Sequence, residues 1–308
     1  MLLKPRADEL SHFIHRGGGM QSKVTPHIPV LRSIAPLAAT CDAWISDVWG
    51  VLHDGAHAHP AASVACERFR AGGGTIVLVS NAPSTGAEVS AHLDSLGVPR
   101  AAYDAIVTSG DVTRALIAGW AGKPVHHLGP DRYLGTFAGL DVAFAPLADA
   151  AVVVCTGLVE DERETPDDYK GLLADMRARG QPMICVNPDI VVERGDRLIY
   201  CAGALAADYE ALGGDVAYAG KPHPPIYARA RELIAEARGA AVETSRILAI
   251  GDGIKTDIAG AAAAGLRAVF IASALHFGDG EALDEATLAH LFAGHPAPPI
   301  AALEALVW

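Results

Sequence analysis

Short apolar runs alternate with longer stretches of helical spacing along most of this chain. From Asp42 onward the apolar runs are rich in valine and isoleucine, which is typical of buried strands. The expected strands are 43–47, 75–79, 105–107, 125–128, 151–155, 183–186, 247–250 and, as the last core strand, 268–271. The expected helices are 60–71, 84–96, 167–179 and 203–212. This alternation predicts an α/β fold with a mostly parallel, Rossmann-like sheet that helices cover on both faces.

The interval between the strand at 75–79 and Lys221 is too long for one crossover connection, and it has strands and helices of its own. It therefore predicts a second α/β domain inserted into the first. The expected limits are 25–109 and 216–308 for the first domain, 110–215 for the inserted domain and 1–24 for a polar, flexible leader.

Polar side chains that can carry chemistry lie at the ends of the expected strands or at a helix start. Open α/β sheets bind ligands at the carboxyl ends of their strands, so we expect these side chains to meet in one site. Each also has an ordinary interpretation as a turn, helix-capping or surface residue. The four groups are Asp47, Ser80 with Asn81, Lys221 ahead of a helix with proline in its first turn, and Asp252 with Asp257.

Charge and composition exclude several classes of partner. The net charge of −12 disfavours nucleic acid, although local cations could still bind a phosphate substrate. No apolar stretch approaches the roughly 18 residues of a membrane span, and the first residues lack the apolar centre of a signal peptide. The five cysteines form no Cys-x-x-Cys pair and predict buried free thiols in a reducing compartment. We therefore expect a cytoplasmic protein without nucleic-acid or membrane partners.

The four groups, in this order over about residues 40–275, resemble the motifs of the haloacid dehalogenase-like hydrolases. An α/β domain inserted between the second and third groups resembles the cap of class IIA members, which include nitrophenylphosphatase-like and sugar phosphatases. The resemblance implies a Mg²⁺-dependent hydrolase that acts as a phosphatase on a small phosphorylated metabolite. It also implies a cap that selects the substrate and a homodimer formed through that cap.

The same resemblance implies which residues carry the reaction. Asp47 would attack phosphorus and form an aspartyl-phosphate that water then cleaves. The Mg²⁺ ligands would be the carboxylates of Asp47, Asp252 and Asp257 and the backbone carbonyl of Trp49.

The remaining implied roles concern the phosphate and the rest of the substrate. Ser80 and the N–H of Asn81 would donate hydrogen bonds to phosphate oxygens, and Lys221 would neutralise charge shared by the nucleophile and the phosphate. In the cap, Asn187 and Asp189 are the expected substrate contacts, because they follow a cap strand in a loop that relatives place toward the site. A plain Asn-Pro turn is the alternative interpretation of that loop.

Trp49 departs from the family pattern, in which a second aspartate at this position acts as general acid and base. Indole has no proton to exchange near neutral pH, and acid–base help is typically worth ~10²–10⁴-fold. The next loop contains His53, Asp54, His57 and His59, and one of them could supply the proton. The three histidines could instead bind a transition metal or be simply solvated.

Because of Trp49, two other functions stay open. The chain could be a non-catalytic protein that binds a phosphorylated ligand, or a hydrolase of C–P or C–halogen bonds.

Overall fold

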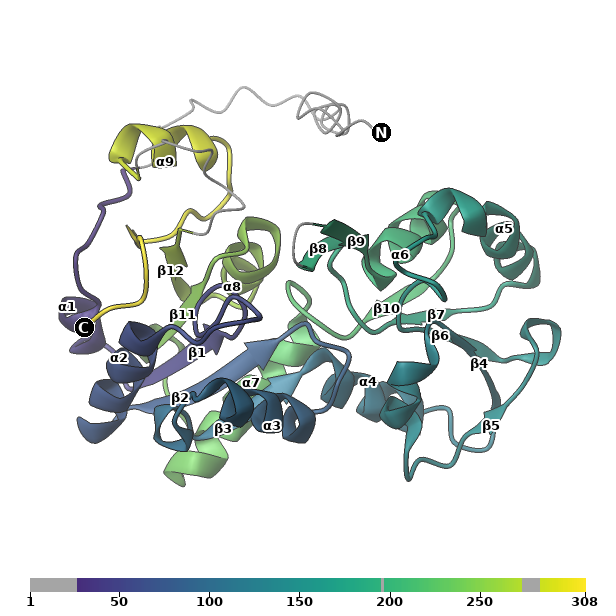
Figure 1. Cartoon of the computed structure of the whole chain (residues 1–308), viewed down its shortest axis with the longest axis horizontal. Helices are drawn as coiled ribbons and strands as arrows, with labels where there is room; N and C mark the ends of the chain where they lie inside the picture. The colour runs from purple at the N-terminus through teal and green to yellow at the C-terminus, as the bar shows by residue number, and fades with distance from the viewer. Residues whose placement is uncertain (1–26, 195–196, 273–282) are drawn as a thin grey trace.

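A parallel sheet forms the centre of the first unit of the fold. The computed structural model describes residues 27–194, 197–272 and 283–308, so the expected leader 1–24 lies outside the described residues. Within these residues the sheet has six strands in the order β13-β12-β11-β1-β2-β3, all parallel (Figure 1). The strands are β1 Ala43–Asp47, β2 Thr75–Ser80, β3 Ala105–Thr108, β11 Ile247–Gly251, β12 Arg267–Ile271 and β13 Ala301–Leu303.

Helices cover both faces of this core sheet, because side chains along each strand alternate between two apolar clusters. The alternation is clearest in β1, where Trp44 enters one cluster and Ile45 the other. The helices on the Trp44 face are α1 Ala35–Ala38, α2 Pro60–Ala71 and α3 Gly86–Leu96. The helices on the Ile45 face are α4 Ser109–Ala118, α7 Pro224–Arg238, α8 Ala259–Ala263 and α9 Glu285–Leu291.

A second parallel sheet, in the order β10-β7-β6-β4-β5, forms the cap, which lies beside the core (Figure 1). Helices α5 and α6 pack on one of its faces. An antiparallel hairpin, β8–β9, leads from the sheet to α6. The cap elements are β4 Pro124–Leu128, β5 Ala143–Phe144, β6 Val152–Cys155, α5 Lys170–Arg179, β7 Met183–Cys185, β8 Val191–Arg194, β9 Arg197–Tyr200, α6 Ala202–Ala211 and β10 Val216–Tyr218.

Helix α4 connects the two units by packing on both. Its Val112 is buried in the core, whereas Ile117, later in the helix, is buried against the cap sheet. A capping box at Thr108 fixes the start of the helix, where the side chains of Thr108 and Asp111 each accept a backbone N–H of the other. The cap is therefore attached to the end of β3 by a helix that both units bury.

The predicted α/β fold with a parallel core and an inserted cap is confirmed. The prediction that 268–271 is the last core strand is wrong, because β13 adds a further parallel strand beside it. This strand has only three residues, too few to show a period. The domain limits stay a prediction, and the cap sheet itself runs from Pro124 to Tyr218.

The order of the core strands decides where a ligand can bind. β1 lies between β2 and β11, so the chain leaves it for one neighbour and returns on its other side. Connections that diverge in this way open a crevice at the carboxyl ends of the strands. Among the described residues, no helix has the length and apolar character needed to cross a membrane.

Candidate active site

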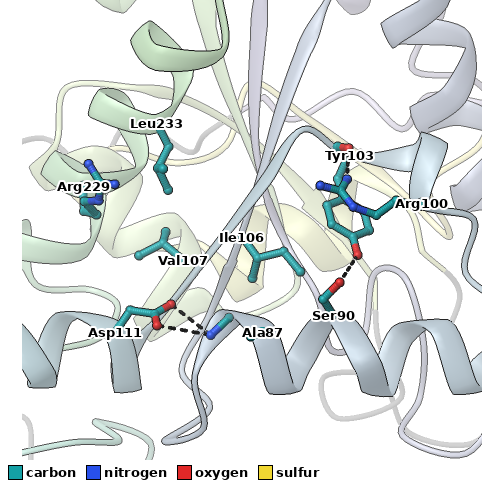
Figure 2. Close-up of a pocket in the computed structure, with 10 residues that line it drawn as sticks. Ala87, Ser90, Arg100, Tyr103, Ile106, Val107, Asp111, Arg229 and Leu233 are labelled. Carbon is teal, nitrogen blue, oxygen red and sulfur yellow. Dashed lines mark hydrogen bonds between the residues drawn. The ribbon is translucent and has the colours of Figure 1, made fainter. Parts of the chain in front are cut away.

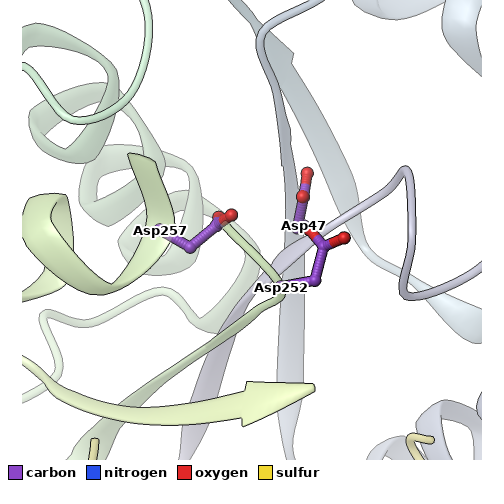
Figure 3. A group of neighbouring side chains, drawn as sticks. All are labelled: Asp47, Asp252 and Asp257. Atoms are coloured by element: carbon purple, nitrogen blue, oxygen red, sulfur yellow. The ribbon is translucent and has the colours of Figure 1, made fainter. Parts of the chain in front are cut away.

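Asp47 ends β1, and two further aspartates follow β11. Asp252 comes directly after that strand, and Asp257 lies in the π-helical turn Ile254–Ile258. Oxygen atoms of the three carboxylates lie within 4.8 Å of one another (Figure 3). Lys221 joins them, because its Nζ lies 2.6 Å from Oδ1 of Asp47 and 2.8 Å from Oδ1 of Asp257. All four side chains are buried, so the structure brings together the predicted nucleophile, lysine and metal-binding carboxylates.

Two glycines allow these carboxylates to approach the strand ends. Gly50 has a φ of 77°, and a Cβ there would lie 2.2 Å from Oδ2 of Asp252. A Cβ on Gly251 would lie 2.2 Å from Cγ of Asp257. A side chain at either glycine would displace a site carboxylate. The sequence prediction assigned neither glycine a role, although each lies close in the chain to a predicted site aspartate.

Burial and charge together set the protonation of the cluster. Burial raises the pKa of Asp47 to about 6, although the positive charge of Lys221 opposes this shift. Burial, and then the charge of Asp47, raises the pKa of Asp257 to about 7. For Lys221 burial lowers the pKa, but the two carboxylates beside it outweigh burial, so its pKa is raised and it stays an ammonium.

This donor set fits a divalent cation. Three carboxylates face one ammonium, which leaves excess negative charge in a buried site. Hard oxygen ligands without any thiolate or imidazole suit Mg²⁺ or Ca²⁺. Among the described residues, this is the group of His, Cys, Asp and Glu side chains arranged to hold a metal ion. The histidines of the loop 53–59, which the structure also describes, do not form such a group.

Ser80 and Asn81 lie at the end of β2, beside β1. The Ser80 hydroxyl accepts a hydrogen bond from the N–H of Ala82 at 3.2 Å, so its own proton remains for a ligand. The side chain of Asn81 binds the backbone of Lys221 twice: its Oδ1 accepts the lysine N–H at 2.7 Å, and its Nδ2 donates to the lysine carbonyl at 3.1 Å. Asn81 therefore holds the backbone of the lysine, a contact that the sequence did not predict.

The cap loop that contains Asn187 and Asp189 reaches the same place. Oδ1 of Asp189 accepts a hydrogen bond from Nδ2 of Asn81 at 2.9 Å. Asn187 is buried, and its Oδ1 accepts the N–H of Asp189 at 2.9 Å, which shapes the loop as an Asx turn. Both predicted cap residues thus lie at the core–cap junction, and Asp189 contacts the predicted phosphate-binding residue.

The side chain of Trp49 packs on its own loop. Its ring edge meets His53, with ring centroids 5.3 Å apart, and a Cβ on Gly55 would lie 2.3 Å from the indole. The loop is closed by the N–H of Gly50, which donates to the carbonyl of His53 at 2.8 Å. The indole is thereby fixed, yet 45% of Trp49 remains exposed.

Two other polar residues of this loop, His53 and Asp54, are committed to its structure. His53 is buried, its Nδ1 accepts the N–H of Gly55 at 2.8 Å, and burial lowers its pKa to about 4. Asp54 accepts the N–H groups of Ala56 and His57, which lower its pKa to about 2. Near neutral pH, His53 is therefore neutral and Asp54 is ionised, and neither is poised to donate a proton to a leaving group.

A pocket of about 410 Å³ lies away from this cluster, beside the outer edge of β3 (Figure 2). Residues of α3 and α7 line it, and Asp111 and Ser90 inside it bind protein groups, the N–H of Gly86 and the hydroxyl of Tyr103. None of the predicted site residues lines this pocket.

Comparison with known proteins identifies the family. A family model of haloacid dehalogenase-like hydrolases matches residues 44–143, and a second family model of similar hydrolases matches residues 218–290. The two matches lie on the predicted core motifs, on either side of most of the cap. A search of curated proteins finds no match.

Solved structures agree with the family models. A hydrolase of the haloacid dehalogenase-like family from Brucella suis 1330 is 47% identical, with a TM-score of 0.79 over 90% of this chain and 100% of that one. A glycerol phosphate phosphatase from Mycobacterium tuberculosis, in complex with calcium, is 26% identical over 76% of this chain and 67% of that one, with a TM-score of 0.59.

A possible sugar phosphatase from Cytophaga hutchinsonii shares the fold, with a TM-score of 0.72 at 21% identity over 91% of this chain and 99% of that one. The same family is indicated by the motifs, by the arrangement of the site and by the 47% identity over nearly the whole chain. This chain belongs to the haloacid dehalogenase-like hydrolase family.

Proposed function

We propose that this hydrolase is a Mg²⁺-dependent phosphatase of a small phosphorylated metabolite and that Asp47 is its nucleophile. One observation carries the proposal: Asp47 ends a central strand within 4.8 Å of two other carboxylates and in contact with a buried lysine. A carboxylate beside an ammonium and an oxygen-ligand cation site is suited to attack a phosphate ester, whose negative charge those cations would balance.

The first step would transfer the phosphoryl group to Asp47. The carboxylate oxygen forms a bond to phosphorus while the ester P–O bond breaks, and the ester oxygen leaves with the electron pair as an alkoxide or aryloxide that takes a proton from water to give the alcohol. The N–H of Val48 and the ammonium of Lys221 both contact Oδ1 of Asp47, at 2.7 Å and 2.6 Å, and so fix its orientation. In the second step water cleaves the aspartyl-phosphate and regenerates the carboxylate.

The remaining residues would bind the phosphate. The hydroxyl of Ser80 and the N–H of Asn81 would donate to its oxygens, and Lys221 would offset its charge. Asp47, Asp252, Asp257 and the carbonyl of Trp49 would hold Mg²⁺, which when bound stabilises negative charge on phosphoryl oxygens.

The cap, which we place at 110–215, would select the substrate through Asn187 and Asp189. The proposal that the substrate is a small phosphorylated metabolite is supported by one relative, a glycerol phosphate phosphatase.

A homodimer through the cap is also proposed, because Phe144 is 55% exposed on the short edge strand β5. All five cysteines are buried, and Cys41, Cys66, Cys155 and Cys185 are free thiols, which supports a cytoplasmic location.

Trp49 and its loop favour a second candidate function, the binding of a phosphorylated ligand without turnover. No carboxylate stands two residues after the nucleophile, and His53 and Asp54 are not suited to replace it. The same residues leave the cleavage of C–P or C–halogen bonds open.

A substrate screen distinguishes these functions. The purified protein is incubated with aryl and alkyl phosphates, phosphonates and haloacids, with Mg²⁺ or with a chelator. We expect phosphate release from the esters that requires Mg²⁺. Turnover of phosphonates or haloacids alone would contradict the proposal and indicate a hydrolase of C–P or C–halogen bonds. Phosphate binding without any turnover would favour the non-catalytic function.

A further inference from the structure

The side chain of Asn81 uses its hydrogen-bonding capacity on protein groups. Its Oδ1 accepts the N–H of Lys221, and its Nδ2 donates both to the carbonyl of Lys221 and to Oδ1 of Asp189. An amide has two donor hydrogens, so both are committed. Only the backbone N–H of Asn81 is left for a phosphate, and the side chain must have another role.

The contact with Asp189 crosses from the core to the cap. The two residues are 108 positions apart, and Asp189 follows the cap strand β7. Its position is tightly constrained: a Cβ on Gly203 of α6 would lie 2.5 Å from the Asp189 carbonyl and 2.1 Å from that of Pro188. The cap helix α6 thus packs directly against the backbone of this loop.

The same loop packs on the backbone next to the lysine. A Cβ on Gly220 would lie 2.7 Å from Cδ of Pro188 and 2.4 Å from Oδ1 of Asn81. There is therefore no space for a methyl group at Gly220, where the cap loop and the side chain of Asn81 both pack against the chain. Beyond this junction, Nζ of Lys221 contacts Asp47 and Asp257 at 2.6 Å and 2.8 Å.

We propose that Asp189 is a positioning residue: by holding Asn81 it fixes Lys221, and it thereby couples the cap loop to the lysine at the nucleophile. This inference rests on the proposed function, in which Lys221 acts on the reacting phosphate. It gives the Asp189 carboxylate and the Asn81 side chain a role toward the lysine, beside the substrate contact that the cap loop is proposed to make. Burial raises the pKa of Asp189, and the hydrogen bond from Asn81 opposes that shift.

Substitutions at Asp189 separate its hydrogen bond from its charge. Asp189→Ala removes the acceptor, and kcat on p-nitrophenyl phosphate should fall about 10–100-fold with KM within about threefold, because small displacements of a catalytic group cost about this much. Asp189→Asn keeps a carbonyl oxygen for Asn81 and should restore kcat to within about threefold of the wild type. A loss as large in Asp189→Asn as in Asp189→Ala would overturn the proposal.

A residue swap keeps the test decisive if Asp189→Ala fails to fold. Asn81→Asp places two carboxylates opposite each other and also removes the donor to the Lys221 carbonyl, so it should lower kcat, whereas Asn81→Asp with Asp189→Asn restores the donor–acceptor pair between residues 81 and 189 alone. The double variant should exceed Asn81→Asp at least about tenfold, as expected for residues in direct contact. A double variant no better than Asn81→Asp would contradict the coupling.

Asp104→Ala is the control, because Asp104 is another carboxylate that accepts a hydrogen bond, here from the backbone N–H of Ile76, and it pairs with Arg70 far from Lys221 in sequence. It should lower Tm and leave kcat unchanged. A crystal structure of Asp189→Ala gives a readout that does not depend on turnover: the 2.6 Å contact between Lys221 and Asp47 should be lost.

The outcomes distinguish this inference from the proposed function. No turnover in the wild type rejects the phosphatase, and the crystal structure of Asp189→Ala still decides the coupling. If Lys221 keeps its contact with Asp47 there, Asp189 does not position it. If the loss in Asp189→Ala is confined to alkyl phosphates, Asp189 acts on the leaving group and the positioning role is rejected.

Discussion

Trp49 is the residue that most limits the proposed chemistry. It stands two positions after Asp47, where a carboxylate would exchange a proton with the leaving group. Its indole is fixed on Gly55 and His53, and neither His53 nor Asp54 is in a protonation state that replaces the acid. The rate should therefore depend steeply on how readily the alcohol leaves without a proton.

The expected result for Trp49→Asp follows from this dependence. The new carboxyl should raise kcat/KM on alkyl phosphates by about 10-fold or more, and on aryl phosphates much less, because nitrophenol leaves without a proton. Trp49→Phe keeps an aromatic ring beside Gly55 and controls for packing, and Tm of each variant checks the fold. If the wild type cleaves both classes equally well, another acid is present and this account of Trp49 is wrong.

Single residues also mark where prediction from the sequence ended. Asp47 and Asp252 could be placed together because strand ends in a parallel sheet share one edge, and Lys221 and Asp257, each expected at a helix start, could be added through the family resemblance. The contact of Asn81 with Asp189 could not, since it depends on how the cap packs on the core. The sequence shows which residues end strands, but it does not show in which direction a loop side chain points or which residue it contacts.

At the scale of elements, the loop after β1 and the turn after β11 fit together through Gly50. Its φ of 77° and its close approach to Asp252 both require glycine. Gly50→Ala should therefore displace Asp252 and weaken Mg²⁺ binding at least about tenfold, besides costing about 1–3 kcal/mol of stability for the strained backbone. Isothermal titration with Mg²⁺ measures the affinity directly.

Gly73→Ala is the control for backbone strain alone. Gly73 has a φ of 88° in the turn before β2, and a methyl group added there would have no other atom within 4 Å. This variant should lose a similar amount of stability and keep the wild-type Mg²⁺ affinity. Equal loss of affinity in both variants would show that instability, and not the displacement of Asp252, is the cause.

Prediction from the sequence was most successful for long apolar elements. The strands β1, β2 and β11 have continuous buried apolar runs, and their limits agree with the predicted ones to within one residue. The strands β13 and β10 have three residues each, and the β8–β9 hairpin exposes Leu198 and Val191. Such elements are held by neighbouring strands and loops, and they carry too little local pattern to be recognised.

At the scale of the whole molecule, a bound cation should stabilise the native fold. The three carboxylates belong to two segments separated by about two thirds of the chain, and they meet only when the core sheet has formed. Mg²⁺ would therefore bind the native state in preference to the unfolded one, and at about 100 times its Kd it would add about 2.7 kcal/mol of stability.

Thermal unfolding tests this coupling. Tm should rise with Mg²⁺ and fall back when a chelator is added. Asp252→Asn should abolish most of the rise, whereas Asp94→Asn, on the exposed side of α3, should keep it. A rise of the same size in Asp252→Asn would place the cation elsewhere on the protein.

The central claim is that Asp47 becomes phosphorylated during turnover. Wild type and Asp47→Asn are mixed with p-nitrophenyl phosphate and Mg²⁺, quenched in acid within the first turnovers, and the peptide that contains residue 47 is analysed by mass spectrometry. The wild-type peptide should carry one phosphoryl group on Asp47, and Asp47→Asn, whose amide is a very poor nucleophile, should carry none and release no phosphate. A phosphoryl group on another residue, or substantial phosphate release by Asp47→Asn, would contradict the account.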